Sequence, residues 1–203
     1  MKRLFALFSI LTFISTASFA QNSAETTPPV PIYDTPITPP AFTWQDEYGQ
    51  TVSLDNFKGD VIFLNFWATW CAPCAYEMPA FNFLQNRYGA GDFKIVAINV
   101  GKEPLEKVNA FLQKNNLDAL SLYMNPENNL TSLFGTNTLP TTYIINRQGQ
   151  IIAGKAGLAS WMSPDMMSFI EQLMKEENPY AVPFILNQRI EDISTDLQPT
   201  IRY

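Results

Sequence analysis

The chain has 203 residues, 13 basic and 19 acidic side chains, a formal net charge of −6, two cysteines and no histidine. This acidic balance argues against binding to nucleic acid, which depends on basic patches that neutralise phosphates, and against a position on anionic lipid. The length allows one domain with a sizeable core plus additional segments.

Residues 1–20 are predicted to form a cleavable signal peptide. Two basic residues precede an apolar run over positions 4–14, and small residues at positions 18 and 20 lie just before the expected cleavage site at Gln21. This order is typical of export signals. The apolar core is shorter than the about 20 residues of a membrane-spanning helix. An uncleaved anchor is the alternative.

Residues 21–40 are predicted to form a Pro-rich arm outside the folded domain. Its prolines concentrate between Pro28 and Pro40. Proline removes backbone donors and favours extended conformations, so we expect a disordered or semi-rigid segment. A ligand for a proline-recognition domain is the alternative.

The folded domain is predicted to cover residues 41–175. Residues 42–44 and 51–54 flank a polar stretch that contains Gly49, and this pattern predicts a β-hairpin. The apolar run Val61-Ile62-Phe63-Leu64 then predicts a buried strand. This strand delivers the chain to the two cysteines.

Cys71 and Cys74 are the only cysteines, and two residues separate them. Only a thiolate attacks a disulfide, and a cysteine in the first turn of a helix has its charge stabilised by free backbone N–H groups and by the helix dipole. We expect a helix to begin at or just after Cys71. Cys71 is therefore the predicted nucleophile, and Cys74, one turn further on and shielded from solvent, is the predicted resolving thiol.

Other uses of a Cys-x-x-Cys pair fit the sequence less well. A tetrahedral zinc site needs further cysteine or histidine ligands, and the chain has none, so no metal is expected. Attachment of a c-type haem needs histidine after the second cysteine, where Ala75 lies. A structural disulfide remains open, but a bridge across two residues removes little entropy from the unfolded chain.

Downstream of the cysteines, the alternation of helical and strand patterns favours a right-handed parallel α/β unit. The predicted segments are a helix that ends near Gly89, a strand over residues 93–100, a helix over 104–115, a short loop and helix over 124–134, an antiparallel pair over 143–146 and 151–153, and a helix from Ser163 to Met174. Residues 176–203 form a C-terminal extension of unknown role.

The string from Asn65 to Pro79, with Trp70-Cys71-Ala72-Pro73-Cys74 at its centre, resembles the thioredoxin superfamily and within it the TlpA-like thiol:disulfide reductases of the periplasm. That group includes the reductases of cytochrome c maturation. The resemblance implies an α/β, thioredoxin-like fold: a central mixed β-sheet flanked by helices, with an N-terminal hairpin. It also implies a periplasmic location, with an inner-membrane anchor facing the periplasm as the alternative, and no cofactor.

The resemblance also implies roles for residues outside the cysteine pair. Glu77 matches a position near the buried sulfur that helps it to exchange protons, although a solvated charge that complements the helix dipole is the alternative. Pro140 matches a cis proline beside the cysteines, which makes Leu139 the substrate-facing residue. Trp70 is expected to shield the disulfide. Thioredoxin has a buried aspartate where this chain has Asn65, so proton handling cannot be copied from it.

The predicted function is the reduction of disulfides in exported proteins. Strong oxidants of the superfamily carry histidine between the cysteines, whereas Ala72 and Pro73 offer no charge that would stabilise a thiolate. Apocytochrome c is one candidate substrate, and a membrane thiol reductant is the expected electron donor. The alternatives are a dithiol oxidant or isomerase, a non-enzymatic interaction module, and a peroxiredoxin-like peroxidase, although Ala68 replaces the threonine of the peroxiredoxin signature.

Overall fold

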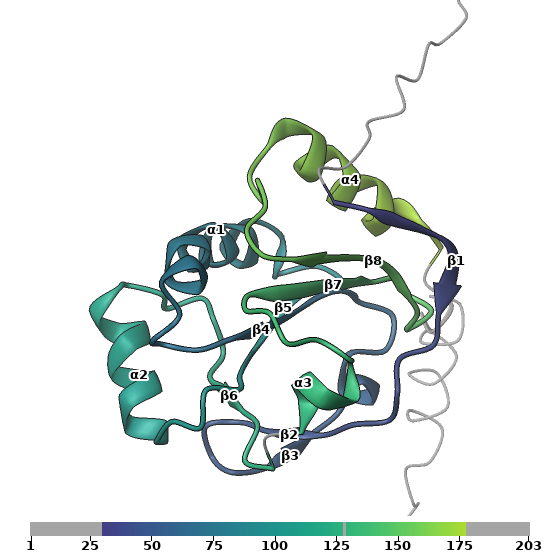
Figure 1. The fold of residues 1–203 in the computed structure, drawn as a ribbon. Helices are drawn as coiled ribbons and strands as arrows, with labels where there is room; N and C mark the ends of the chain where they lie inside the picture. Colours follow the sequence, from purple (N-terminus) through teal and green to yellow (C-terminus); the bar gives the residue numbers. More distant parts are fainter. Residues whose placement is uncertain (1–29, 128, 178–203) are drawn as a thin grey trace, which may run out of the picture.

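The computed structural model describes residues 30–127 and 129–177 (Figure 1). The predicted signal peptide and nearly all of the C-terminal extension lie outside the described residues. Within them, the strands are β1 (Ile32–Ile37), β2 (Trp44–Gln45), β3 (Thr51–Val52), β4 (Val61–Trp67), β5 (Phe93–Asn99), β6 (Tyr123–Met124), β7 (Thr141–Ile145) and β8 (Ile151–Ala156). The helices are η1 (Leu54–Phe57), α1 (Ala72–Tyr88), α2 (Leu105–Lys114), α3 (Leu130–Leu133) and α4 (Pro164–Lys175).

The strands form one mixed sheet in the order β1-β8-β7-β4-β5-β6-β2-β3. Strand β4 pairs parallel with β5, from Val61 opposite Phe93 to Trp67 opposite Asn99, and antiparallel with β7 on its other side. The parallel pairing of β4 with β5 agrees with the predicted α/β unit. Strand β6, which pairs parallel with β5, lies where the sequence predicted only a loop. The predicted α/β class with a mixed central sheet is confirmed.

Every residue of β4 is buried, because cores lie on both faces of the sheet. Phe63 and Trp67 pack in one core with residues of α1, α2 and α4. Ile62 and Phe66 face the other core, which Trp44 of β2 and the helix α3 help to close. Strand β4 is therefore a rigid central element, and its C-terminal end leads directly into the cysteine segment.

The predicted local structures are mostly confirmed. Strands β2 and β3 form the N-terminal hairpin, and β7 and β8 form the antiparallel pair. Helix α4 begins after Ser163, whose hydroxyl accepts a hydrogen bond from the Met166 N–H (3.2 Å), and Pro164 takes its first position. No helix within the described ranges combines the length and the apolar character that crossing a bilayer requires.

The start of the domain differs from the prediction. Residues 32–37, which were assigned to the arm, form strand β1 and pair antiparallel with β8 at the edge of the sheet. An edge strand tolerates Pro36 because one side of it needs no ladder hydrogen bond. Tyr33 of this strand packs over Gly154, where a Cβ atom would lie only 2.3 Å from the Tyr33 hydroxyl. The folded domain thus begins before residue 41.

Candidate active site

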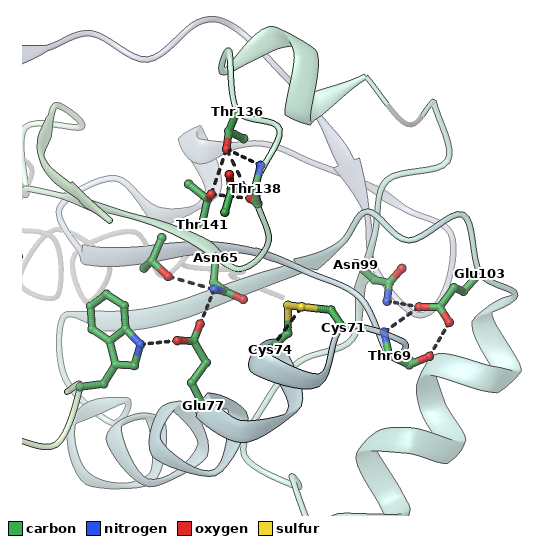
Figure 2. Close-up of a disulfide and its surroundings, with 12 residues drawn as sticks. Asn65, Thr69, Cys71, Cys74, Glu77, Asn99, Glu103, Thr136, Thr138 and Thr141 are labelled. Atoms are coloured by element: carbon green, nitrogen blue, oxygen red, sulfur yellow. Dashed lines mark hydrogen bonds between the residues drawn. A yellow bond between two sulfur atoms is a disulfide. The ribbon is translucent and has the colours of Figure 1, made fainter. Parts of the chain in front are cut away.

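Cys71 and Cys74 are joined by a disulfide at the start of α1 (Figure 2). Cys71 is the N-cap of the helix, as the sequence predicted, and its sulfur accepts a hydrogen bond from the Cys74 backbone N–H at 3.2 Å. A free N–H group and the positive end of the helix dipole both favour a thiolate at this position. The local backbone is therefore suited to an anionic sulfur at Cys71.

The two sulfurs lie in different environments. Cys74 is fully buried, in agreement with the expected shielding, whereas Cys71 retains 6% exposure. Cys71 also lines a groove of about 670 Å³, together with Trp70, Pro73 and Leu139. A disulfide in another molecule can thus approach Cys71 but not Cys74.

The peptide bond between Leu139 and Pro140 is cis, as the resemblance implied. Pro140 is buried, and its carbonyl accepts a hydrogen bond from the Gly157 N–H at 2.8 Å. Leu139 is half-buried and lines the groove beside Cys71. The structure therefore brings Leu139, more than 60 positions after the cysteines, beside Cys71, and the cis bond follows it directly.

Trp70 is 63% exposed at the rim of the same groove. Its indole N–H donates a hydrogen bond to the Gly101 carbonyl at 3.2 Å, which fixes the ring beside the disulfide. The ring adds apolar surface where a partner would dock, in keeping with the substrate-binding role that the sequence predicted. That role remains a prediction.

Glu77 lies one helical turn after Cys74 on the buried face of α1 and is 3% exposed. Its carboxylate accepts hydrogen bonds from the Asn65 amide (3.2 Å) and from the Trp161 indole (2.8 Å), as Figure 2 shows. Burial raises the pKa of Glu77 to about 7, although the bonds from Trp161 and Asn65 oppose this shift. This environment excludes the solvated surface charge and suits a group that exchanges protons near neutral pH.

A second buried carboxylate, Glu103, was not foreseen from the sequence. Its side chain is 3% exposed. Four donors surround it: the Thr69 backbone N–H (2.8 Å), the Thr69 hydroxyl, the Asn99 amide (3.1 Å) and the Lys107 ammonium (2.8 Å). Because Thr69 lies two residues before Cys71, Glu103 holds the segment that carries the more accessible of the two cysteines. No local pattern places this carboxylate at the cysteine segment, because Thr69, through which it contacts that segment, precedes it by 34 positions.

A family model described as the AhpC/TSA family matches residues 38–153. The chain belongs to the AhpC/TSA family. The expected relationship to thioredoxin-like proteins is thereby confirmed. It rests on more than half of the chain, a stretch that includes both cysteines, Glu77 and the cis proline.

Individual relatives of this AhpC/TSA chain agree with that assignment. It is 35% identical over 114 residues to a thiol-disulfide oxidoreductase ResA of Geobacillus thermodenitrificans, covering 56% of this chain and 64% of the relative. A ResA of Halalkalibacterium halodurans is 32% identical over 136 residues, covering 67% and 74%. A crystal structure of a thiol:disulfide interchange protein from Chlorobium tepidum superimposes with a TM-score of 0.55 at 25% identity, covering 70% and 99%. The match to the first ResA thus spans less than two thirds of that protein.

Among the described residues of this AhpC/TSA chain, no group of three or more His, Cys, Asp or Glu side chains is placed to hold a metal ion. The acidic residues near the cysteines are instead engaged separately, Glu77 with Asn65 and Trp161, and Glu103 with Thr69, Asn99 and Lys107.

The Glu103→Gln variant is expected to be less stable than the wild-type protein above about pH 4.5. Burial alone would raise the pKa of Glu103, but the hydrogen bonds from Lys107, Thr69 and Asn99 outweigh it and lower the pKa to about 2. The carboxylate therefore stabilises the folded state above the unfolded-state pKa, and this contribution, on the order of 2–3 kcal/mol, is lost as the pH falls toward 2.

Urea unfolding at pH 7 and at pH 3 measures this difference. The free energies of unfolding of the wild type and of Glu103→Gln should differ at pH 7 and differ less at pH 3. Glu106→Gln, an exposed substitution in the first turn of α2 three residues after Glu103, is the matched control and should follow the wild type at both pH values. An equal loss at both pH values would show that the charge of Glu103 is not what stabilises the site.

Proposed function

We propose that this chain is a thiol:disulfide oxidoreductase that reduces disulfides of exported proteins through Cys71 and Cys74. The observation that carries the proposal is the asymmetry of the pair: Cys71 caps a helix and lines a groove, whereas Cys74 is fully buried one turn before Glu77. The relatives described as thiol-disulfide oxidoreductases support the same activity.

The reaction begins with the reduced pair. The Cys71 thiolate attacks one sulfur of the substrate disulfide, the substrate S–S bond breaks, and its other sulfur leaves as a thiolate that takes up a proton. The result is a mixed disulfide on Cys71. Cys74 then transfers its proton to Glu77 and attacks the Cys71 sulfur, which releases the second substrate thiolate. Two electrons have passed to the substrate, and the protein holds the disulfide.

Several chain features fit this sequence of steps. The groove along Trp70 and Leu139 gives an incoming extended segment a place beside Cys71. Glu77, with a pKa near 7, can accept a proton and release it again under mild conditions. Ala72 and Pro73 supply no charge that would favour the dithiol form, so the pair is expected to be a reductant.

A periplasmic location, a membrane thiol reductant as electron donor and apocytochrome c as one candidate substrate complete the proposal. They rest on the signal-peptide pattern of residues 1–20 and on the resemblance to TlpA-like reductases. An exported reductant needs such a donor because thiols outside the cytoplasm are oxidised by default.

Equilibration of the Cys71–Cys74 pair in dithiothreitol or glutathione buffers tests the direction of electron flow. We expect a midpoint near the roughly −270 mV of thioredoxin and well below the roughly −120 mV of a strong oxidant such as DsbA. Quantifying free thiols by alkylation and mass measurement gives the midpoint. A midpoint near roughly −120 mV would reassign the protein as a dithiol oxidant.

A further inference from the structure

One oxygen atom beside the disulfide lacks a hydrogen-bond partner. The Asn65 side chain is fully buried on strand β4, and its amide nitrogen donates to Glu77 Oε1 (3.2 Å) and to Thr142 Oγ1 (2.9 Å). Its amide oxygen, Oδ1, is buried and has no hydrogen-bond partner within residues 30–127 and 129–177. The ionised Glu77 carboxylate can only accept, so in that form it faces the NH₂ group and fixes the orientation of the amide.

The unpaired Oδ1 lies on the disulfide side of the Asn65 amide (Figure 2). Cys74 and Glu77 are three residues apart on α1, so their side chains are neighbours on one face of the helix. Asn65 hydrogen-bonds to Glu77, and in Figure 2 its amide oxygen points toward the Cys71–Cys74 disulfide. In this structure Cys74 is disulfide-bonded and carries no S–H that could donate to the oxygen.

A buried acceptor without a partner is unfavourable, and most such groups in folded proteins are paired. Breaking the disulfide would add one new donor, the Cys74 S–H, to this buried cluster. A thiol is a weak donor, but it is the donor that the reaction itself supplies. In the disulfide form, Asn65 Oδ1 therefore lacks the hydrogen-bond donor that the reduced form would supply.

We propose that Asn65 is a positioning residue whose Oδ1 accepts a hydrogen bond from the Cys74 thiol whenever the disulfide is open. The proposal deepens the oxidoreductase function and rests on it for its biological meaning. Asn65 therefore stabilises the dithiol relative to the disulfide, and during the mixed-disulfide stage it holds the Cys74 thiol in place; the S–H then rotates from Oδ1 to the ionised Glu77 carboxylate, which takes the proton as Cys74 attacks.

The electron and proton balance shows which redox state the hydrogen bond stabilises. A dithiol donor transfers two electrons and two protons: the Cys71–Cys74 bond breaks, each cysteine gains one hydrogen, and the donor becomes a disulfide. Only the reduced form then contains the bond from Cys74 to Asn65. Removing the acceptor should consequently shift the equilibrium toward the disulfide and make the reduction potential more negative.

The decisive experiment observes the Cys74 thiol directly. In a Cys71→Ala protein, Cys74 is the only thiol, so the infrared S–H stretching band reports on that group alone. We expect the band to lie at lower frequency, as for a hydrogen-bonded thiol, and to move to higher frequency when Asn65→Leu is added. Thr142→Val, which removes a partner of the amide nitrogen and leaves Oδ1 in place, is the matched control and should keep the band low.

The redox equilibrium of the intact pair gives a second readout. Asn65→Leu should favour the disulfide by about tenfold, which corresponds to a potential about 30 mV more negative. Thr142→Val should change the equilibrium less than threefold. Asn65→Val, whose β-branched side chain suits a strand, serves as a second variant if Asn65→Leu does not fold.

An S–H band that is the same with and without Asn65 would overturn the proposal, as would a potential that rises in the Asn65 variants. The infrared measurement needs no substrate and no turnover. A protein that fails to reduce any disulfide can therefore still show the hydrogen bond, and an active oxidoreductase can still lack it. Failure of the proposed function and failure of this inference are thus distinguishable.

Discussion

A Cys74→Ala variant should accumulate mixed disulfides with its substrates, at least tenfold above the level in the wild type or in Cys71→Ala. Cys71 keeps its helix cap and its place in the groove when Cys74 is replaced, so the first attack still occurs. The step that resolves the adduct needs a second sulfur close to Cys71, and that sulfur is missing. In Cys71→Ala, the remaining thiol is fully buried and cannot reach a protein substrate.

The measurement is to mix each reduced variant with a disulfide-bonded test protein, to quench with an alkylating agent and to separate the adducts without reductant. Circular dichroism verifies that both variants are folded. The double variant, which has no thiol, sets the background and should form no adduct. Equal trapping by the two single variants would show that the roles of nucleophile and resolving thiol are wrongly assigned.

The second large effect is expected at Glu77. Replacing it with glutamine keeps the size of the side chain but removes the group that accepts the Cys74 proton, so the resolving step should slow by about 10²-fold or more. The carboxylate form acts as the base, and the pKa of Glu77 is about 7. The wild-type rate of this step should therefore rise with pH and level off above about pH 7, whereas the variant should lack this rise.

Single-turnover kinetics with a rapidly quenched mixed disulfide separate this step from the first attack. Glu106→Gln on the exposed face of α2 is a matched control for the loss of one carboxylate and should leave the rate unchanged. A Glu77→Gln protein that resolves its adduct at the wild-type rate at all pH values would remove Glu77 from the mechanism.

The same substitution should change how stability depends on pH. The folded-state pKa of Glu77 lies above its ordinary value of 4.5, so a bound proton stabilises the folded state and this contribution is lost as the pH rises through about 7. Between pH 5 and pH 8, the disulfide form of the wild type should lose on the order of 2 kcal/mol more than Glu77→Gln. Urea unfolding at the two pH values measures the difference.

The parts of the site that could be predicted are those encoded in short stretches of chain. An apolar strand, a turn and a proline at the first helical positions are enough to place Cys71 at a helix start. The cis peptide at Pro140 came from the resemblance, because the low frequency of cis prolines gives no basis for expecting one. The burial of Glu77 was less certain, since an acidic residue early in a helix is often solvated.

The polar contacts that Trp161 makes with Glu77 and Thr142 makes with Asn65 could not be predicted, because the partners lie far apart along the chain. Trp161 follows Glu77 by 84 positions, and Thr142 follows Asn65 by 77. Which polar groups meet is decided by sheet register and helix packing, neither of which a local pattern contains. Strand β1 was missed for a different reason: a proline-rich composition suggested an extended arm, yet an edge strand accepts proline and needs few buried side chains.

The hydrogen bond from Trp161 to Glu77 joins the loop before α4 to the helix that carries the cysteines. A nascent or denatured chain has the same two cysteines, but without this bond and the surrounding core Glu77 is solvated and titrates as an ordinary carboxylate. A short peptide copied from residues 65–79 should accordingly behave as a common dithiol. The reactivity that distinguishes this cysteine pair is therefore acquired only when distant segments have packed together, and it depends on the folded domain as well as on the Cys-x-x-Cys motif.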